Sequence, residues 1–320
     1  MSISLRIVFM GTPEFAVSTL DAILKSNHTV VGVVTVPDKP ANRGLKLQAS
    51  AVKEFALKNN LPVLQPDKLK SEEFISELKK LNPDLQVVVA FRMLPEVVWS
   101  LPKLGTINLH ASLLPQYRGA APINWAIING EKETGITTFF ISHQIDTGDI
   151  LMQEKIEIKD DDDAGILHDK LMASGAALVI KTLDAISEKG KDVETVKQVI
   201  TSNIRSAPKI FREDCKIDWN NTLEEVHDFI RGLNPYPGSY TELINDEGTK
   251  LTLKIFKTAK HIDITLPEGQ LLVSDTNQLL MGCADGTIEI LELQAEGRKK
   301  MRAIDFLRGF PIHTLNWKAL

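Results

Sequence analysis

The chain has 320 residues, long enough for two domains with separate cores, and carries 42 acidic against 37 basic side chains. Its formal net charge of −5 excludes the strongly basic balance of a general nucleic-acid binder, so any nucleic-acid contact must depend on local patches. No apolar run comes near the roughly 20 residues that a bilayer span requires, and the amino-terminal segment resembles a strand more than a signal peptide. We therefore expect a cytoplasmic protein that makes no membrane contact.

Short β-branched runs alternate with longer helical patterns in the first half of the chain. This alternation, from Leu5 to about Ile158, predicts an α/β domain with a Rossmann-like, mostly parallel sheet and helices on both faces. In such sheets ligands bind beyond the carboxyl ends of the strands. The runs that we assign to strands are RIVFMG, TVVGVVTV, DLQVVVA, GTINLH and GITTFFIS.

The first strand leads into the turn MGTPEFA, which contains a single glycine. A dinucleotide-binding fingerprint needs about three glycines at this point. The chain also lacks the glycine-rich phosphate loop that ends in Gly-Lys-Ser or Gly-Lys-Thr. The sequence therefore argues against a nicotinamide enzyme.

A long polar segment, PDKPANRGLKLQASAVK at residues 37–53, follows the second strand. Pro37, Pro40 and Gly44 discourage regular structure, so we expect an irregular loop. Loops of this length inside compact domains are usually functional or disordered, and plain flexibility is the alternative here. The loop supplies positive charge on an otherwise acidic protein through Lys39, Arg43, Lys46 and Lys53.

The strand GTINLH ends in an amide and an imidazole two residues apart. Because strand side chains alternate between faces, Asn108 and His110 should share one face. An amide N–H at such a place can stabilise negative charge that develops on a carbonyl oxygen. Asp146 follows the strand GITTFFIS, and if that strand is parallel it ends at the same edge, where a carboxylate would orient His110 and favour its cationic form. The three side chains together suit acyl-type transfer through a tetrahedral intermediate.

Two other chemistries use residues of the same region. Ser112 could form a covalent acyl-enzyme, but the usual strand–nucleophile–helix elbow is missing, so direct attack of a substrate amine on a bound acyl donor is simpler. His110, His143 and Asp146 could form a set of two histidines and one carboxylate for a metal, although we expect no metal. Cys215 and Cys283 lie too far apart in sequence to suggest a cysteine-rich metal site or a disulfide scaffold, and we expect both to be reduced.

The remainder of the chain predicts a second domain. Residues 164–189 have apolar residues at helical spacing and close a first, catalytic domain at 1–189. The polar stretch 190–205 is the linker candidate, and residues 206–320 form the second domain. The acidic run at 160–163 is typical of a solvated turn.

The second domain begins with a helix and continues with short strands. TLEEVHDFIRGL is amphipathic, and Thr222 and Glu225 have the spacing of a capping box. Runs such as KLTLKIFKTAK, GQLLVS and GTIEILELQ, separated by Gly, Asn and Asp turns, predict a small, OB-like β-barrel. Two basic groups could contact RNA or simply be solvated; they contain Lys254 and Lys260, and Arg298, Lys299, Lys300 and Arg302.

Three blocks of the sequence resemble the methionyl-tRNA formyltransferase family, whose members are folate-dependent formyltransferases. They are GTPEFA at 11–16, NLHASLLPQYRGAAPI at 108–123 and DTGD at 146–149, and the order and spacing of blocks agree from about residue 5 to 310. The resemblance implies transfer of a formyl group from 10-formyltetrahydrofolate to the amino group of methionine on initiator tRNA, for translation initiation.

The resemblance also implies roles for the residues at the strand end. Asn108 would donate a hydrogen bond to the formyl oxygen, and His110 would stabilise the oxyanion and assist proton movement. Asp146 would orient His110 and help to deprotonate the amine. Tetrahydrofolate would bind to a loop, and to a pterin-lining segment AFRMLP that has Phe91-Arg92 where many relatives have Tyr-Gly; the folate-binding residues would be Ser112, Leu113, Leu114, Pro115, Arg92, Met93 and Leu94.

The same resemblance implies contacts with tRNA. In the family the loop at 37–53 wedges into the acceptor end, and Arg43 with Gly44 matches its Arg-Gly core. Arg43 would read a base edge, while the lysines would meet phosphates. The residues expected to contact tRNA are Arg43, Lys39, Lys46, Lys254 and Lys299. The alternatives are an amino-sugar formyltransferase, a hydrolase of the formyl donor and a catalytically silent RNA-binding module.

Overall fold

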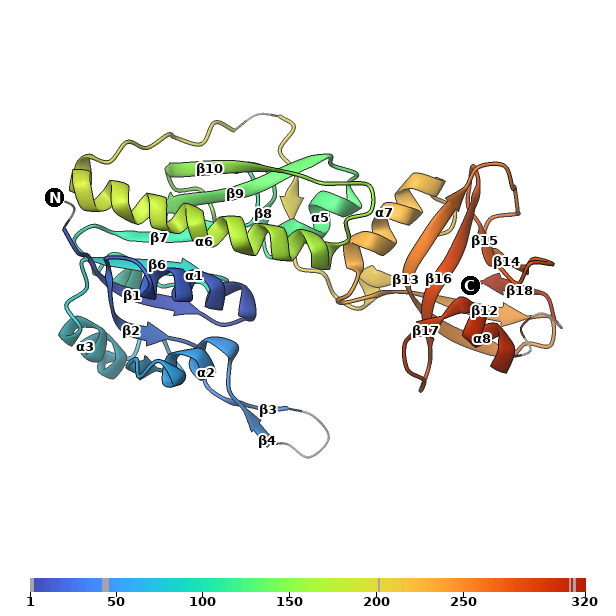
Figure 1. Ribbon diagram of the computed structural model, residues 1–320, viewed down its shortest axis with the longest axis horizontal. Coiled ribbons are helices and arrows are strands. Elements are labelled where there is room, and N and C mark those ends of the chain that lie inside the picture. Colours follow the sequence, from blue (N-terminus) through green and yellow to red (C-terminus); the bar gives the residue numbers. More distant parts are fainter. Residues whose placement is uncertain (1–2, 42–45, 201, 311, 313–314) are drawn as a thin grey trace. The chain divides into compact units, whose positions relative to one another are not determined.

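The computed structural model describes residues 3–41, 46–200, 202–310, 312 and 315–320. The chain forms two compact units (Figure 1). The first contains Met1–Gly119, Glu133–Glu157 and His168–Ser206, and the second contains Ala120–Lys132, Ile158–Leu167 and Ala207–Leu320. The domain boundaries inferred from the sequence, 1–189, 190–205 and 206–320, stay a prediction.

A seven-stranded sheet in the order β10-β9-β7-β6-β1-β2-β5 forms the centre of the first unit. Strands β7, β6, β1, β2 and β5 run parallel, whereas β9 and β10 pair antiparallel. Most of the parallel strand residues are buried, which is why their sequences are almost continuous apolar runs. The Rossmann-like sheet is therefore confirmed. The strands are β1 Arg6–Gly11, β2 Thr29–Val34, β5 Val63–Leu64, β6 Leu85–Val89, β7 Thr106–His110, β9 Glu133–Phe140 and β10 Ile150–Glu157.

Helix α6, Ala164–Lys189, confirms the long helix predicted from apolar spacing. It packs closely on the sheet, since a Cβ on its Gly175 would lie 2.8 Å from Cδ2 of Leu109 in β7. Farther along α6, the Thr182 and Thr138 hydroxyl oxygens lie 2.8 Å apart. The other helices of this unit are α1 Glu14–Leu24, α2 Ala51–Lys58, α3 Glu72–Lys80 and α4 Glu96–Trp99, followed by the 3₁₀ helix η1 Gly190–Asp192.

The direction of β9 differs from the prediction. We expected a parallel strand, but β9 runs antiparallel to β7, with His110 opposite Thr137. A parallel connection needs a crossover helix that packs on the sheet. The helix between these strands, α5 (Pro122–Ile128), belongs instead to the second unit, where the Asn124 amide donates to the Gly232 carbonyl at 2.8 Å.

The segment at 37–53 also differs from the irregular loop that we expected. Strands β3 (Lys39–Ala41) and β4 (Lys46–Gln48) pair antiparallel. Pro40 is tolerated because the ladder has only two strands, so an edge position is available for a residue without an N–H. Arg43 and Gly44 lie outside the described residues.

A closed antiparallel barrel forms the second unit, as the sequence predicts. Six strands follow the order β13-β12-β18-β14-β15-β16, and pairing of β13 with β16 closes the ring. Trp219 anchors its core, because the buried indole Nε1–H donates to the Thr241 hydroxyl at 2.9 Å. The strands are β12 Ser239–Asn245, β13 Lys250–His261, β14 Gln270–Val273, β15 Leu279–Gly282, β16 Thr287–Ala295, β17 Met301–Arg302 and β18 Trp317–Ala319.

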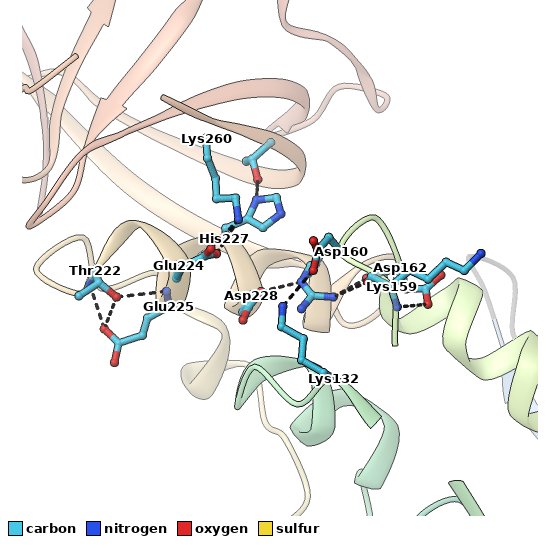
Figure 2. A network of polar contacts seen from close by, with 12 residues as sticks. Lys132, Lys159, Asp160, Asp162, Thr222, Glu224, Glu225, His227, Asp228 and Lys260 are labelled. Atoms are coloured by element: carbon cyan, nitrogen blue, oxygen red, sulfur yellow. Dashed lines mark hydrogen bonds and ion pairs between the residues drawn. The ribbon is translucent and has the colours of Figure 1, made fainter. Parts of the chain in front are cut away.

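Helix α7, Leu223–Leu233, lies at the centre of the polar network in Figure 2. The predicted capping box of Thr222 and Glu225 is confirmed. The buried Arg231 pairs with Asp228 at 2.7 Å and donates to the Asp162 carbonyl at 2.8 Å. The remaining elements of the chain are β8 Arg118–Gly119, β11 Ser206–Ala207, the 3₁₀ helix η2 Glu213–Cys215 and helix α8 Ala303–Gly309.

The acidic run at 160–163 is only partly the solvated turn that we expected. Asp160 is exposed and pairs with Lys132 at 2.9 Å (Figure 2). Asp162 is buried, because its carboxylate accepts the Lys159 N–H at 2.8 Å and no longer needs water.

Cys215 and Cys283 are free thiols, as predicted, and burial raises the pKa of the Cys283 thiol to about 12. Within the part of the chain that the structure describes, no helix is long and apolar enough to cross a membrane.

Candidate active site

His110 ends strand β7 and is almost fully buried. Its Nε2 lies 2.9 Å from the Tyr117 carbonyl oxygen, which can only accept, so Nε2 carries a proton. Its Nδ1 lies 3.8 Å from Oδ2 of Asp146, close enough for an ion pair but too long for a hydrogen bond. The structure thus brings together the predicted imidazole and carboxylate, although the strand direction used to predict their meeting was wrong.

The carboxylate oxygen of Asp146 that faces His110 is also held by the loop that follows β7. The Gly119 N–H donates to Oδ2 of Asp146 at 3.0 Å. The backbone of Asp146 has a φ of +54°, in the left-handed region that residues other than glycine seldom adopt. A specific loop conformation therefore sets the position of this carboxylate.

Asn108 lies two residues before His110 on the same strand, so the two share one face of the sheet, as predicted. It is half-buried. Its side-chain amide makes no hydrogen bond with the described residues. The amide is therefore available to a bound molecule.

The loop at 112–115, predicted to bind folate, is held by side chains of β9 and β10. The Thr137 hydroxyl donates to the Ser112 carbonyl at 2.6 Å and accepts the Leu114 N–H at 3.2 Å, and the Gln153 amide donates to the Leu114 carbonyl at 2.9 Å. Leu114 is buried in a small apolar cluster. The Ser112 hydroxyl donates to the Gln116 carbonyl at 2.6 Å, and a hydroxyl engaged in this way does not suit a nucleophile.

The side chains of the segment predicted to line the pterin pocket are held in three different ways. The Arg92 guanidinium donates to the carbonyl of Asp67 at 3.1 Å and to that of Pro66, and it lies over the Phe91 ring. Leu94 packs in the core of the first unit. Met93 is 73% exposed, so it is the most accessible of the three side chains that we predicted to bind folate here.

The alternative metal set is not assembled. His143 Nε2 lies 3.7 Å from Glu96 Oε1, and its ring meets the Trp99 ring edge-on at 5.2 Å. Among the residues that the structure describes, no three histidine, cysteine or carboxylate side chains are grouped to hold a metal ion.

The predicted tRNA-contacting lysines of the first unit are in the β3–β4 hairpin. Lys39 is exposed, and Lys46 lies opposite Ala41 in the backbone ladder of β3 and β4. Lys53, by contrast, is paired with Asp38 at 2.6 Å, and this hydrogen bond lowers the pKa of the Asp38 carboxyl. Lys53 is therefore less suited to phosphate contact than the sequence suggests.

Ion pairs also neutralise much of the basic surface of the second unit. Lys260 pairs with Glu224, Lys300 with Glu292 and Arg302 with Asp305. Lys254 and Lys299 have no carboxylate partner among the described residues. The Lys254 ammonium donates to the Pro237 carbonyl at 3.1 Å. The two lysines that we predicted to contact tRNA thus keep their charge available.

Sequence reasoning missed the residues that hold these loops. Thr137 and Gln153 lie on strands, and Gln198 lies in the stretch assigned to a linker. Nothing in their local sequence marks them, because their partners are backbone groups distant in the chain.

Known families match both parts of the sequence. The family model described as formyl transferase matches residues 5–183, and the one described as formyl transferase, C-terminal domain, matches residues 209–311. A methionyl-tRNA formyltransferase of Bacteroides fragilis is 54% identical over 308 residues, which cover 96% of this chain and 95% of that protein. The chain belongs to the methionyl-tRNA formyltransferase family. A relative of the same name from Flavobacterium johnsoniae is 50% identical, over 95% of this chain and 96% of that protein.

Solved structures of formyltransferase fold share the architecture at lower identity. HypX from Aquifex aeolicus in complex with tetrahydrofolic acid superimposes with a TM-score of 0.64 at 18% identity, covering 95% of this chain and 47% of that one. WlaRD, a sugar 3N-formyl transferase, gives 0.63 at 23% identity, covering 93% and 100%. The family membership makes this chain a formyl-transferring enzyme of translation initiation.

Proposed function

We propose that this enzyme transfers the formyl group of 10-formyltetrahydrofolate to the amino group of methionyl-initiator tRNA by direct attack of the amine. The observation that carries the proposal is the pairing of His110 with Asp146 beside the available amide of Asn108. An oxyanion donor, an imidazole and a carboxylate are the groups that acyl transfer to an amine requires.

The reaction balances without a covalent enzyme intermediate. The amine nitrogen attacks the formyl carbon, and the carbonyl electrons move to oxygen, where the N–H groups of Asn108 stabilise the charge. Nδ1 of His110 makes no hydrogen bond with the described residues, so in the protonated ring it can also donate to this oxyanion. Asp146 helps to take the proton that the amine loses. Collapse breaks the bond to N10 of the folate, which receives a proton and leaves as tetrahydrofolate.

For the folate, we propose contacts with the loop Ser112, Leu113, Leu114 and Pro115 and with the segment that contains Arg92, Met93 and Leu94. The hydrogen bonds from Thr137 and Gln153 support this by giving the loop one fixed shape. Because the side chains of Ser112, Arg92 and Leu94 are engaged within the protein, main-chain groups and Met93 are the better candidates for contact. No metal takes part in this scheme.

For the tRNA, we propose that Arg43 reads a base edge of the acceptor end and that Lys39, Lys46, Lys254 and Lys299 meet phosphates. The free charge of Lys254 and Lys299, among neighbours that are paired, supports their choice. We also propose that catalysis resides in 1–189 and tRNA binding by the barrel in 206–320, and that the enzyme works in the cytoplasm.

The test is transfer of labelled formyl from the folate to charged initiator tRNA, with an amino-sugar nucleotide and no acceptor as controls. Asn108→Ala should lower the rate about a hundredfold, equivalent to about 3 kcal/mol of transition-state stabilisation, while folate binding changes far less. Normal turnover in Asn108→Ala would remove its proposed role. Transfer to the sugar, or turnover without any acceptor, would identify a sugar formyltransferase or a hydrolase instead.

A further inference from the structure

Residues 196–200 and 202–205 contact both loops of the candidate site. This stretch first pairs with the chain after Asp146, where the N–H of Val196 and that of Ile150 each donate to the other's carbonyl at 2.8 Å. It ends on the loop after β7, where the Tyr117 N–H donates to the Arg205 carbonyl at 2.7 Å. All of these residues belong to the first unit. We call the described residues of this stretch, 196–200 and 202–205, the strap.

The apolar side chains at 196–200 do not attach this part of the strap. Val196 is 66% exposed, Val199 71% and Ile200 72%. Since burial of these side chains contributes little, hydrogen bonds must hold this part of the strap on the protein.

Gln198 makes the central attachment. Its Nε2 donates to the carbonyl oxygens of Asp146 at 2.9 Å and Gly148 at 2.8 Å. Its Oε1 accepts from Nε of Arg118 at 3.1 Å and from Nη2 of the same guanidinium at 2.5 Å. A primary amide has two N–H donors and two acceptor lone pairs, so Gln198 uses its whole hydrogen-bonding capacity here.

The groups that Gln198 joins belong to the loop that carries Asp146 and to the loop that follows His110. One is the backbone of Asp146 itself. The other is Arg118, which stands between Tyr117, whose carbonyl binds His110, and the Gly119 N–H, which binds the Asp146 carboxylate. A single amide thus fixes both loops whose spacing sets the distance from imidazole to carboxylate.

We propose that Gln198 is a positioning residue for formyl transfer, which keeps Asp146 in register with His110 by clamping the two loops. The expected fall in kcat rests on the proposed function. The expected change in the position of Asp146 relative to His110 does not. A misplacement of about 1 Å in a catalytic group can cost about a hundredfold in rate. Loss of the clamp should therefore lower the rate without removing any group that touches a substrate.

Two substitutions remove different hydrogen bonds of the Gln198 amide. Gln198→Met keeps length and volume but removes every hydrogen bond. Gln198→Glu keeps the acceptor for Arg118 but turns a second oxygen toward the two carbonyls, where like partial charges repel. Val199→Ala, at the exposed neighbouring position, is the matched control.

We expect kcat to fall at least about tenfold in Gln198→Met and Gln198→Glu, with KM for folate and tRNA within about twofold of the unaltered enzyme. Val199→Ala should change neither. The pH–rate profiles of the two Gln198 variants should move in the same direction as that of Asp146→Asn, which a merely structural role would not produce.

A second readout needs no substrate. Nitrogen NMR of the His110 ring at one fixed pH should give ring-nitrogen chemical shifts in Gln198→Met that differ from those of the unaltered protein, whereas Val199→Ala should reproduce the original spectrum. Unchanged His110 ring shifts and unchanged kcat in a folded Gln198→Met protein would overturn the proposal; if that variant unfolds, Gln198→Glu decides by the same criteria. If the unaltered enzyme does not formylate charged tRNA, the proposed function fails, and the NMR comparison still decides whether Gln198 positions the pair.

Discussion

Gly148 provides the sharpest test of how the site loop is built. A Cβ added at this position would lie 1.6 Å from the carbonyl oxygen of Phe140 and 2.8 Å from its carbonyl carbon. Real Cβ atoms essentially never come closer than 3.0 Å, so Gly148→Ala must move backbone by about 1.4 Å. The obstacle is backbone of β9, which cannot rotate away as a side chain would. The displaced segment also carries Asp146, only two residues earlier.

A shift of this size should separate Asp146 from His110, which now lie 3.8 Å apart, and weaken the bond from the Gly119 N–H. We expect Gly148→Ala to lose about a hundredfold in kcat and about 1–3 kcal/mol in the free energy of unfolding. The assay is single-turnover formyl transfer at saturating folate, together with urea denaturation. Gly309→Ala is the matched control, because nothing lies within 4 Å of its added Cβ. A Gly148→Ala enzyme with the rate of Gly309→Ala would refute this account of the loop.

Three further outcomes are expected. Arg231→Met leaves the buried carboxylate of Asp228 without its partner and should lower the free energy of unfolding by about 3–5 kcal/mol in urea; a loss below about 1 kcal/mol would contradict the pairing. Burial lowers the pKa of His227 below its ordinary 6.5, so as the pH falls the unfolded chain takes up the proton first and the folded state loses stability. His227→Gln should therefore lose less stability than the unaltered protein between about pH 7.5 and about pH 5.5 in matched denaturation curves. Equal losses in the two proteins would contradict this role of His227. Thr137→Val removes the hydroxyl that donates to the Ser112 carbonyl, so the free energy of unfolding should fall by about 1–3 kcal/mol and the KM for folate should rise. A normal KM for folate would show that this loop does not contribute to folate binding.

The fold was largely accessible from the sequence, because apolar periodicity reflects which faces are buried. The run DLQVVVA contains β6, whose residues are all buried, and the apolar spacing over 164–189 corresponds to α6. The direction of a strand could not be predicted, since a strand has the same apolar pattern whether it pairs parallel or antiparallel with its neighbour. The direction of β9 depends on where α5 packs, and that is a tertiary choice.

Part of the candidate site could likewise be predicted from the sequence, and part could not. The shared face of Asn108 and His110 follows from the pleat of one strand and could be predicted. The clamp by Gln198 could not, because its partners are carbonyl groups about 50 positions earlier, and every residue has a carbonyl. The ion pairs of the basic clusters could not be predicted for a related reason: Lys260 and Lys300 look unpaired in the sequence, yet each pairs with a carboxylate distant in the chain.

Backbone groups contact both side chains of the His110–Asp146 pair. The carbonyl of Tyr117 fixes the imidazole, and the N–H of Gly119 fixes the carboxylate. A side-chain substitution at Tyr117 leaves the carbonyl oxygen in place, whereas one at Gly119, whose φ is +128°, would strain the backbone that carries the N–H. The geometry is therefore exposed to mutation through residues that hold the backbone, such as Gln198. Losses of rate outside the reacting groups should follow from changes at such anchors, because these residues hold both halves of the pair.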